Sequence, residues 1–182
     1  MEKATLIVIQ KRHNGDDVIE NVLNYTLNSV FADVEEMMTN ELCDYDLDKM
    51  IEQFYQVQEP YECLKSHRRL FHFLLTTRVS KNMARTLDEG AVALYDYCVQ
   101  KGHQCLLVPH YGSQQNHNHY HWHAVVNVKS YMTGETLLDK YTTYQEIVNY
   151  LNQSPYVQWG WKYRKDKRFV NNGCGVILPE LL

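Results

Sequence analysis

The segment His119–Val128 reads His-Tyr-His-Trp-His-Ala-Val-Val-Asn-Val, and its alternation constrains the fold more than any other feature of the chain. In a β-strand, successive side chains point to opposite faces of the sheet. One face therefore carries His119, His121, His123, Val125 and Asn127, and the other carries Tyr120, Trp122, Ala124, Val126 and Val128. The second set is apolar enough to form a core. We therefore expect the histidines to lie on the opposite, working face.

A second strand, Cys105–Val108, is expected just upstream, stopped by Pro109 and followed by His110. If Gly112–Asn118 forms a hairpin turn, His110 lies opposite His121, with Cβ atoms about 4.5–5.5 Å apart. The three imidazoles of His110, His121 and His123 then converge on one metal ion. Three protein ligands that leave open positions indicate a catalytic site, because closed structural sites usually take four.

The remaining hydrophobic patterns predict strands and helices in mixed order. Strands are expected at 5–10, 70–76, 157–161 and 175–178, and helices at 21–27, 46–56, 82–101 and 142–152. No repeat or linker divides the 182 residues, so we expect a single domain over 1–182. The order predicts an α+β fold, a two-layer sandwich in which helices pack on a mainly antiparallel sheet.

Composition narrows the functional classes. The chain is 45% hydrophobic and 22% charged, which is typical of a globular protein and not of a disordered one. It has no membrane-length apolar run and no signal-peptide pattern, and its five cysteines form no CxxC pair. We therefore expect a cytoplasmic protein with reduced thiols and no membrane partner. The net charge of −4 is unusual for a dedicated nucleic-acid binder.

Local basic clusters could still bind DNA. The run 162–168 contains five cations in seven residues and follows two tryptophans. Basic residues beside aromatic ones can follow a single-stranded backbone and stack its bases. The alternative is a solvated hairpin tip, and DNA binding requires that the clusters border the histidine face. The candidate residues are Arg68, Arg69, Trp159, Trp161, Lys162, Arg164, Lys165, Lys167 and Arg168.

Several of these motifs resemble those of the HUH endonucleases, and among them the relaxase (mobilization nuclease) family. The resemblance lies in the His121-Trp-His123 pair, the apolar strand that closes on Asn127, and His110 eleven positions upstream of His121. The segment Leu70–Phe73 resembles the family's middle strand, and Val22–Asn28 resembles the segment that bears its nucleophilic tyrosine.

The resemblance implies a metal-dependent enzyme that nicks single-stranded DNA at a specific site and strand. Tyr25 would attack a phosphate and form a 5′-phosphotyrosine intermediate, at an origin of transfer of a plasmid or mobile element and with accessory transfer proteins as partners. The ion would be Mn or Mg, with Zn, Ni or Co as alternatives, because imidazoles favour the transition metals whereas Mg is abundant. His72 is expected to orient the tyrosine or the phosphate, and Asn127 to hydrogen-bond a ligand imidazole or to cap the strand.

Two alternatives stay open. Tyrosines after the histidine strand (Tyr141, Tyr144 and Tyr150) would place the chain among rolling-circle replication initiators or transposases of the same superfamily. A non-catalytic DNA-binding module would keep the fold without turnover.

Overall fold

The computed structural model describes residues 4–9, 17–43, 45–61, 68–77, 84–112, 119–155 and 160–166. The elements follow in the order β1 (Ala4–Ile9), α1 (Val18–Leu27), β2 (Met38–Asn40), α2 (Leu47–Gln58), β3 (Leu70–Thr76), α3 (Ala84–Lys101), β4 (His103–Tyr111), β5 (Tyr120–Ser130), α4 (Tyr141–Gln153) and β6 (Trp161–Asp166), with short 3₁₀ turns at Val34–Glu36 and Glu59–Tyr61. None of the helices in these ranges is long and apolar enough to cross a membrane.

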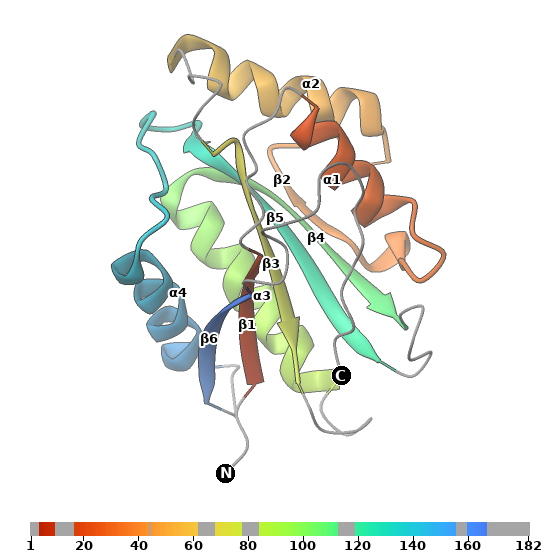
Figure 1. Ribbon diagram of the computed structural model, residues 1–182, viewed down its shortest axis with the longest axis vertical. Coiled ribbons are helices and arrows are strands. Elements are labelled where there is room, and N and C mark those ends of the chain that lie inside the picture. The colour runs from red at the N-terminus through yellow and green to blue at the C-terminus, as the bar shows by residue number, and fades with distance from the viewer. Residues whose placement is uncertain are drawn as a thin grey trace.

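The strands form one mixed sheet in the order β2-β4-β5-β3-β1-β6 (Figure 1). Within the described ranges, all neighbours are antiparallel except β1 and β6, which are parallel. Strands β4 and β5 form the predicted hairpin pair, with His110 directly opposite His121. The expected α+β fold with a mainly antiparallel sheet is therefore confirmed.

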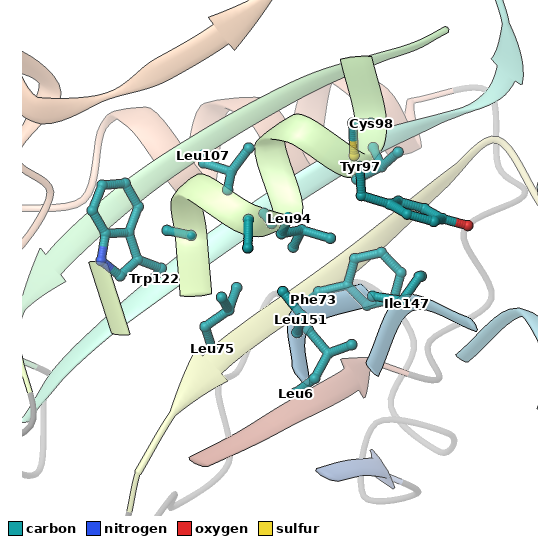
Figure 2. Close-up of a cluster of buried hydrophobic side chains, with 14 of the residues drawn as sticks. Leu6, Phe73, Leu75, Leu94, Tyr97, Cys98, Leu107, Trp122, Ile147 and Leu151 are labelled. Carbon is teal, nitrogen blue, oxygen red and sulfur yellow. The ribbon is translucent and has the colours of Figure 1, made fainter. Parts of the chain in front are cut away.

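The larger core lies on what we call the back face of the sheet. Strand side chains such as Phe73, Leu107 and Trp122 pack there against Leu94 of α3 and Leu151 of α4 (Figure 2). All five are 4% exposed or less. The apolar half of the alternating strand thus forms the core, as predicted.

A smaller core lies on the opposite side, the front face. Leu23 of α1 and Phe54 of α2 pack against Leu106, Val108 and Val125 of the sheet. Figure 1 shows α1 and α2 over one part of the sheet and α3 and α4 behind it. The helices therefore occupy both faces, and three layers replace the two we expected, because α1 and α2 bury the aliphatic residues that share a face with the histidines.

Two local expectations need correction. Strand β4 continues through Pro109 to Tyr111. The Pro109 carbonyl accepts a hydrogen bond from the Asp33 N–H (2.9 Å) on the side of β4 away from β5. The backbone nitrogen of Pro109, which has no N–H, points to the same side, so the proline removes no hydrogen bond between β4 and β5. The basic run begins as strand β6, not as a hairpin tip. The strand expected at 175–178 lies outside the described residues.

Candidate active site

The predicted histidine triad forms at the end of β4 and the start of β5. His110, His121 and His123 each offer one ring nitrogen, and these three atoms lie within 4.8 Å of one another. The exposed fractions of the three side chains are 1%, 4% and 0%. The Nε2 atoms of His121 and His123 are 3.0 Å apart. Two imidazole nitrogens bound to one ion at 2.0–2.2 Å are also separated by about 3 Å, so the spacing fits a shared metal ion.

Each triad histidine has its other ring nitrogen next to a hydrogen-bond acceptor. His110 Nε2 lies 2.9 Å from the Thr26 carbonyl, and His121 Nδ1 lies 3.2 Å from the His119 carbonyl. His123 Nδ1 lies 2.7 Å from His72 Nε2. When the nitrogen next to the acceptor carries the ring proton and donates it, the remaining ring nitrogen has a free lone pair for a metal ion. This arrangement fixes the tautomer and is usual for metal-bound histidines.

The electrostatics of the triad also favour metal binding. Burial, together with the neighbouring His110, lowers the pKa of His72 to about 3, and burial lowers the pKa of His121 to about 3. Burial likewise lowers the pKa of His110 and His123. These imidazoles are therefore neutral at pH 7, which is the form that binds a metal ion.

Helix α1 places Tyr25 beside the triad. Its ring centroid is 5.5 Å from that of His123 and 6.4 Å from those of His72 and His110. The next residue, Thr26, supplies the carbonyl that holds His110, so the helix carrying the tyrosine is tied directly to a candidate ligand. Burial raises the pKa of the Tyr25 phenol above its ordinary value.

The tyrosines of α4 lie on the other side of the sheet. Tyr144 is buried in the back-face core and donates to Asp139. The Tyr150 hydroxyl accepts from Gln100 of α3 (2.6 Å), and Tyr141 begins the same helix. Because the triad faces the front, this arrangement disfavours an α4 nucleophile.

The contacts of His72 and Asn127 bear differently on their expected roles. His72 lies on β3, with its Nε2 2.7 Å from His123 Nδ1 and its ring centroid 6.4 Å from that of Tyr25, and its role in orienting the tyrosine or the phosphate stays a prediction. The Asn127 carboxamide donates to the Phe54 carbonyl and to Gln104, and accepts from Gln58 and from the N–H of Lys129. Its four hydrogen-bonding positions are thus occupied, so the expected bond to a ligand imidazole is wrong. Asn127 also lies inside β5, three residues before its end at Ser130, so the alternative of a strand-end cap is wrong as well.

Strand β6 divides the basic run between the two faces. Trp161 is 2% exposed in the back-face core and cannot stack on a base. Lys165 pairs with Asp139 (3.2 Å) on that same side. Lys162 and Arg164 alternate with these residues and therefore face the front, and both are exposed. Trp159, Lys167 and Arg168 lie outside the described residues.

The other basic candidates, Arg68 and Arg69, lie at the far end of β3, about 20 Å along the strand from the level of His121. Arg68 pairs with Asp139 (2.9 Å), and its guanidinium lies 4.7 Å from the centre of the Phe71 ring. Arg69 donates to Gln58 (3.3 Å). These contacts support structural roles rather than contacts with DNA at the triad.

Sequence reasoning missed two supports of the site. The Thr26 carbonyl holds His110, but a backbone group leaves no signal in a sequence. Asp88 of α3 accepts from Tyr120 and from Trp122 Nε1 (3.0 Å), and so fixes β5 from the back at the level of His121.

The chain matches the model of a protein family. Residues 25–154 match the relaxase model described as "MobA/VirD2-like, nuclease domain". The matched range begins at Tyr25 and includes the whole triad. No curated protein and no solved structure matched the chain. Since the family model covers more than two-thirds of the 182 residues, the chain belongs to the relaxase family and contains its MobA/VirD2-like nuclease domain.

Proposed function

We propose that this protein is a metal-dependent nickase that cuts one strand of DNA at a specific site through a 5′-phosphotyrosine intermediate. The observation that carries the proposal is the placement of Tyr25 beside three convergent, neutral histidines. The family membership supports a DNA-nicking role in general. The nucleophile, the metal ligands and the intermediate are our inference from the geometry.

The donor set fits a divalent ion. His110 would bind through Nδ1, and His121 and His123 through Nε2, because the other nitrogen of each ring faces an acceptor. A bound ion would polarise a non-bridging phosphate oxygen and stabilise the charge that develops on it. Imidazole donors favour Mn, Zn, Ni or Co by their chemistry, and Mg is the alternative on grounds of abundance.

The protein groups divide the remaining work. Tyr25 Oη would form a bond to phosphorus as the bond from phosphorus to the 3′-oxygen breaks. The phenolic proton is lost and the departing 3′-oxygen gains a proton through solvent, so the step is balanced. The product keeps a phosphodiester to the tyrosine and can be rejoined without a new energy source. His72 would hold the His123 ring in position through their 2.7 Å contact.

The substrate we propose is single-stranded DNA at an origin of transfer. With this substrate, the protein would act in the cytoplasm in the transfer of a plasmid or mobile element, and accessory transfer proteins would be its partners. Lys162 and Arg164 are the described basic residues of β6 that share the face of the triad. Phosphate contacts of this kind supply affinity and position the strand, whereas base contacts determine sequence preference.

The test is covalent trapping. Wild type and Tyr25→Phe are incubated with Mn²⁺ and a library of labelled single-stranded oligonucleotides. Adducts are separated on a denaturing gel, and the modified residue is identified by peptide mapping. We expect an adduct on Tyr25 that is lost in Tyr25→Phe, and the substitution should leave Mn²⁺ binding in calorimetry intact.

Other outcomes would favour the alternatives. An adduct on Tyr144 or Tyr150 would contradict the placement of α4 and indicate a replication initiator or transposase. Binding of DNA and Mn²⁺ with no adduct on any library member would favour a non-catalytic DNA-binding module.

A further inference from the structure

A row of polar side chains crosses the front face from the triad to the β6 edge of the sheet. His110 of β4 pairs with His121 of β5. Thr76 of β3 comes next, one position beyond the Leu75–Trp122 pair. Thr76 pairs with Thr5 of β1, and Thr5 pairs with Lys162 of β6. We call Thr76, Thr5 and Lys162 the polar row.

Exposure increases along the polar row away from the triad. Thr76 is 9% exposed, Thr5 is half-buried and Lys162 is exposed. The Thr76 hydroxyl lies 3.1 Å from His119 Nε2. The His119 ring in turn stacks on His121, with ring centroids 5.0 Å apart, so His119 links Thr76 to the triad. The row thus connects the candidate site to the surface without a break in polarity.

The other routes across the front face from the triad are apolar or covered by helices. The next row of the sheet contains Leu74 and Ile7, both 1% exposed and apolar, before it reaches Arg164. Further along β5, Val125 is covered by α1 and α2. Among the described residues, a polar ligand that extends across the sheet from His121 toward β6 therefore meets the polar row first.

We infer that Thr76, Thr5 and Lys162 bind the sugar–phosphate backbone of the single strand next to the scissile phosphate. This inference rests on the proposed nicking function. Hydroxyl groups and lysine ammonium groups are common phosphate contacts, and they position a strand without reading its sequence. Strands lie 4.7–4.9 Å apart, so the row spans about 14 Å from His121 to Lys162. That length accommodates a short stretch of extended backbone leading to the reacting bond.

The residues of the polar row are positioning residues and should differ in how they affect binding. Lys162 contributes charge, so its removal should lower the salt dependence of binding. The two threonines contribute neutral hydrogen bonds, so their removal should weaken binding without changing that dependence. Strand β6 offers a matched control, because Lys165 carries the same charge on the opposite face.

The experiment measures the anisotropy of a fluorescein-labelled random-sequence single-stranded oligonucleotide across a salt series, with EDTA present to prevent nicking. For Lys162→Gln we expect the slope of log K against log salt to fall by about 0.7, whereas Lys165→Gln should leave it unchanged. For Thr76→Val and Thr5→Val we expect affinity to fall about tenfold at constant slope. Thermal melting and Mn²⁺ calorimetry of each variant check that the fold and the triad remain intact.

The inference is overturned if Lys162→Gln and Lys165→Gln have equal slopes, if folded threonine variants bind like wild type, or if the wild type does not bind the oligonucleotide. The adduct assay separates this failure from that of the proposed function. Adducts on Tyr25 together with unchanged slopes would reject the polar row and keep the nickase. A Lys162-dependent slope without adducts would keep the polar row and reject nicking.

Discussion

The two faces of strand β5 are both buried, but what buries them differs. On the back, Trp122 and Ala124 belong to the large apolar core under α3 and α4. On the front, His121 and His123 are 4% and 0% exposed and contact each other, and His123 also lies against Tyr25. Burial of apolar groups stabilises a fold, whereas burial of polar groups costs free energy unless hydrogen bonds compensate. The back face therefore supplies stability, and the front face uses some of it to keep three imidazoles neutral and convergent.

Removal of the front-face ligands should give the largest effect. The double substitution His121→Ala/His123→Ala takes two of three donors from the triad, so Mn²⁺ binding in titration calorimetry and covalent adduct formation should both be lost. The fold should survive, because both faces keep their apolar clusters. Unchanged stoichiometric Mn²⁺ binding in the double variant would end the assignment of the triad as a metal site.

Truncation of a side chain on the back face should lower stability but leave Mn²⁺ binding intact. Phe73 is fully buried and stacks on Phe71 with ring centroids 5.6 Å apart. Phe73→Ala should lower the free energy of unfolding by about 3–5 kcal/mol, because it removes apolar contacts and leaves a cavity. Urea denaturation measures the loss. Below the melting temperature, Mn²⁺ affinity should stay near that of wild type, and a large loss of affinity would show that the two faces are not separable.

The division between faces was largely predictable from the sequence because it rests on a local rule. The period of two in β5 separates the histidines from Trp122, and the short stretch of sequence between β4 and β5 predicts the register that places His110 opposite His121. Burial of Phe73 and the limits of β3 follow from the same kind of local pattern.

The supports of the site depend on pairings between distant segments and so left no local signal. His72 meets His123 only because β3 pairs with β5 across 51 residues of sequence. Lys162 and Lys165 separate to opposite faces only because the basic run forms a strand beside β1. The expectation for Trp161 failed for the same reason, since the nearby cations indicated a surface segment and the strand places its indole in the core.

A medium effect is expected where the front face depends on β3. His72→Leu removes the acceptor next to His123 Nδ1, so Mn²⁺ affinity should fall about 10–100-fold. His72→Gln keeps an acceptor oxygen on a side chain of similar length and should recover part of that affinity. Calorimetry of the two variants measures the difference. Equal losses in both would indicate that His72 fills space rather than orients His123.

The smallest effect should appear in the pH dependence of the metal-free protein. The pKa of His72 and of His121 is about 3 in the folded state, against about 6.5 in an unfolded chain. The unfolded state therefore binds more protons between these values, so stability is fully present above pH 6.5 and falls as the pH decreases toward 3. At about pH 5.5, one unit below the unfolded pKa, each such histidine should cost about 1.4 kcal/mol.

Urea denaturation in EDTA at about pH 7.5 and about pH 5.5 measures this loss. The double variant His121→Ala/His123→Ala is the matched comparison, because it lacks two front-face imidazoles and should show a shallower dependence. Phe73→Ala, in contrast, should lower stability equally at both pH values, since it removes no titrating group. If the free energy of unfolding falls by the same amount in wild type and in the double variant, the substituted histidines are not the source of the pH dependence.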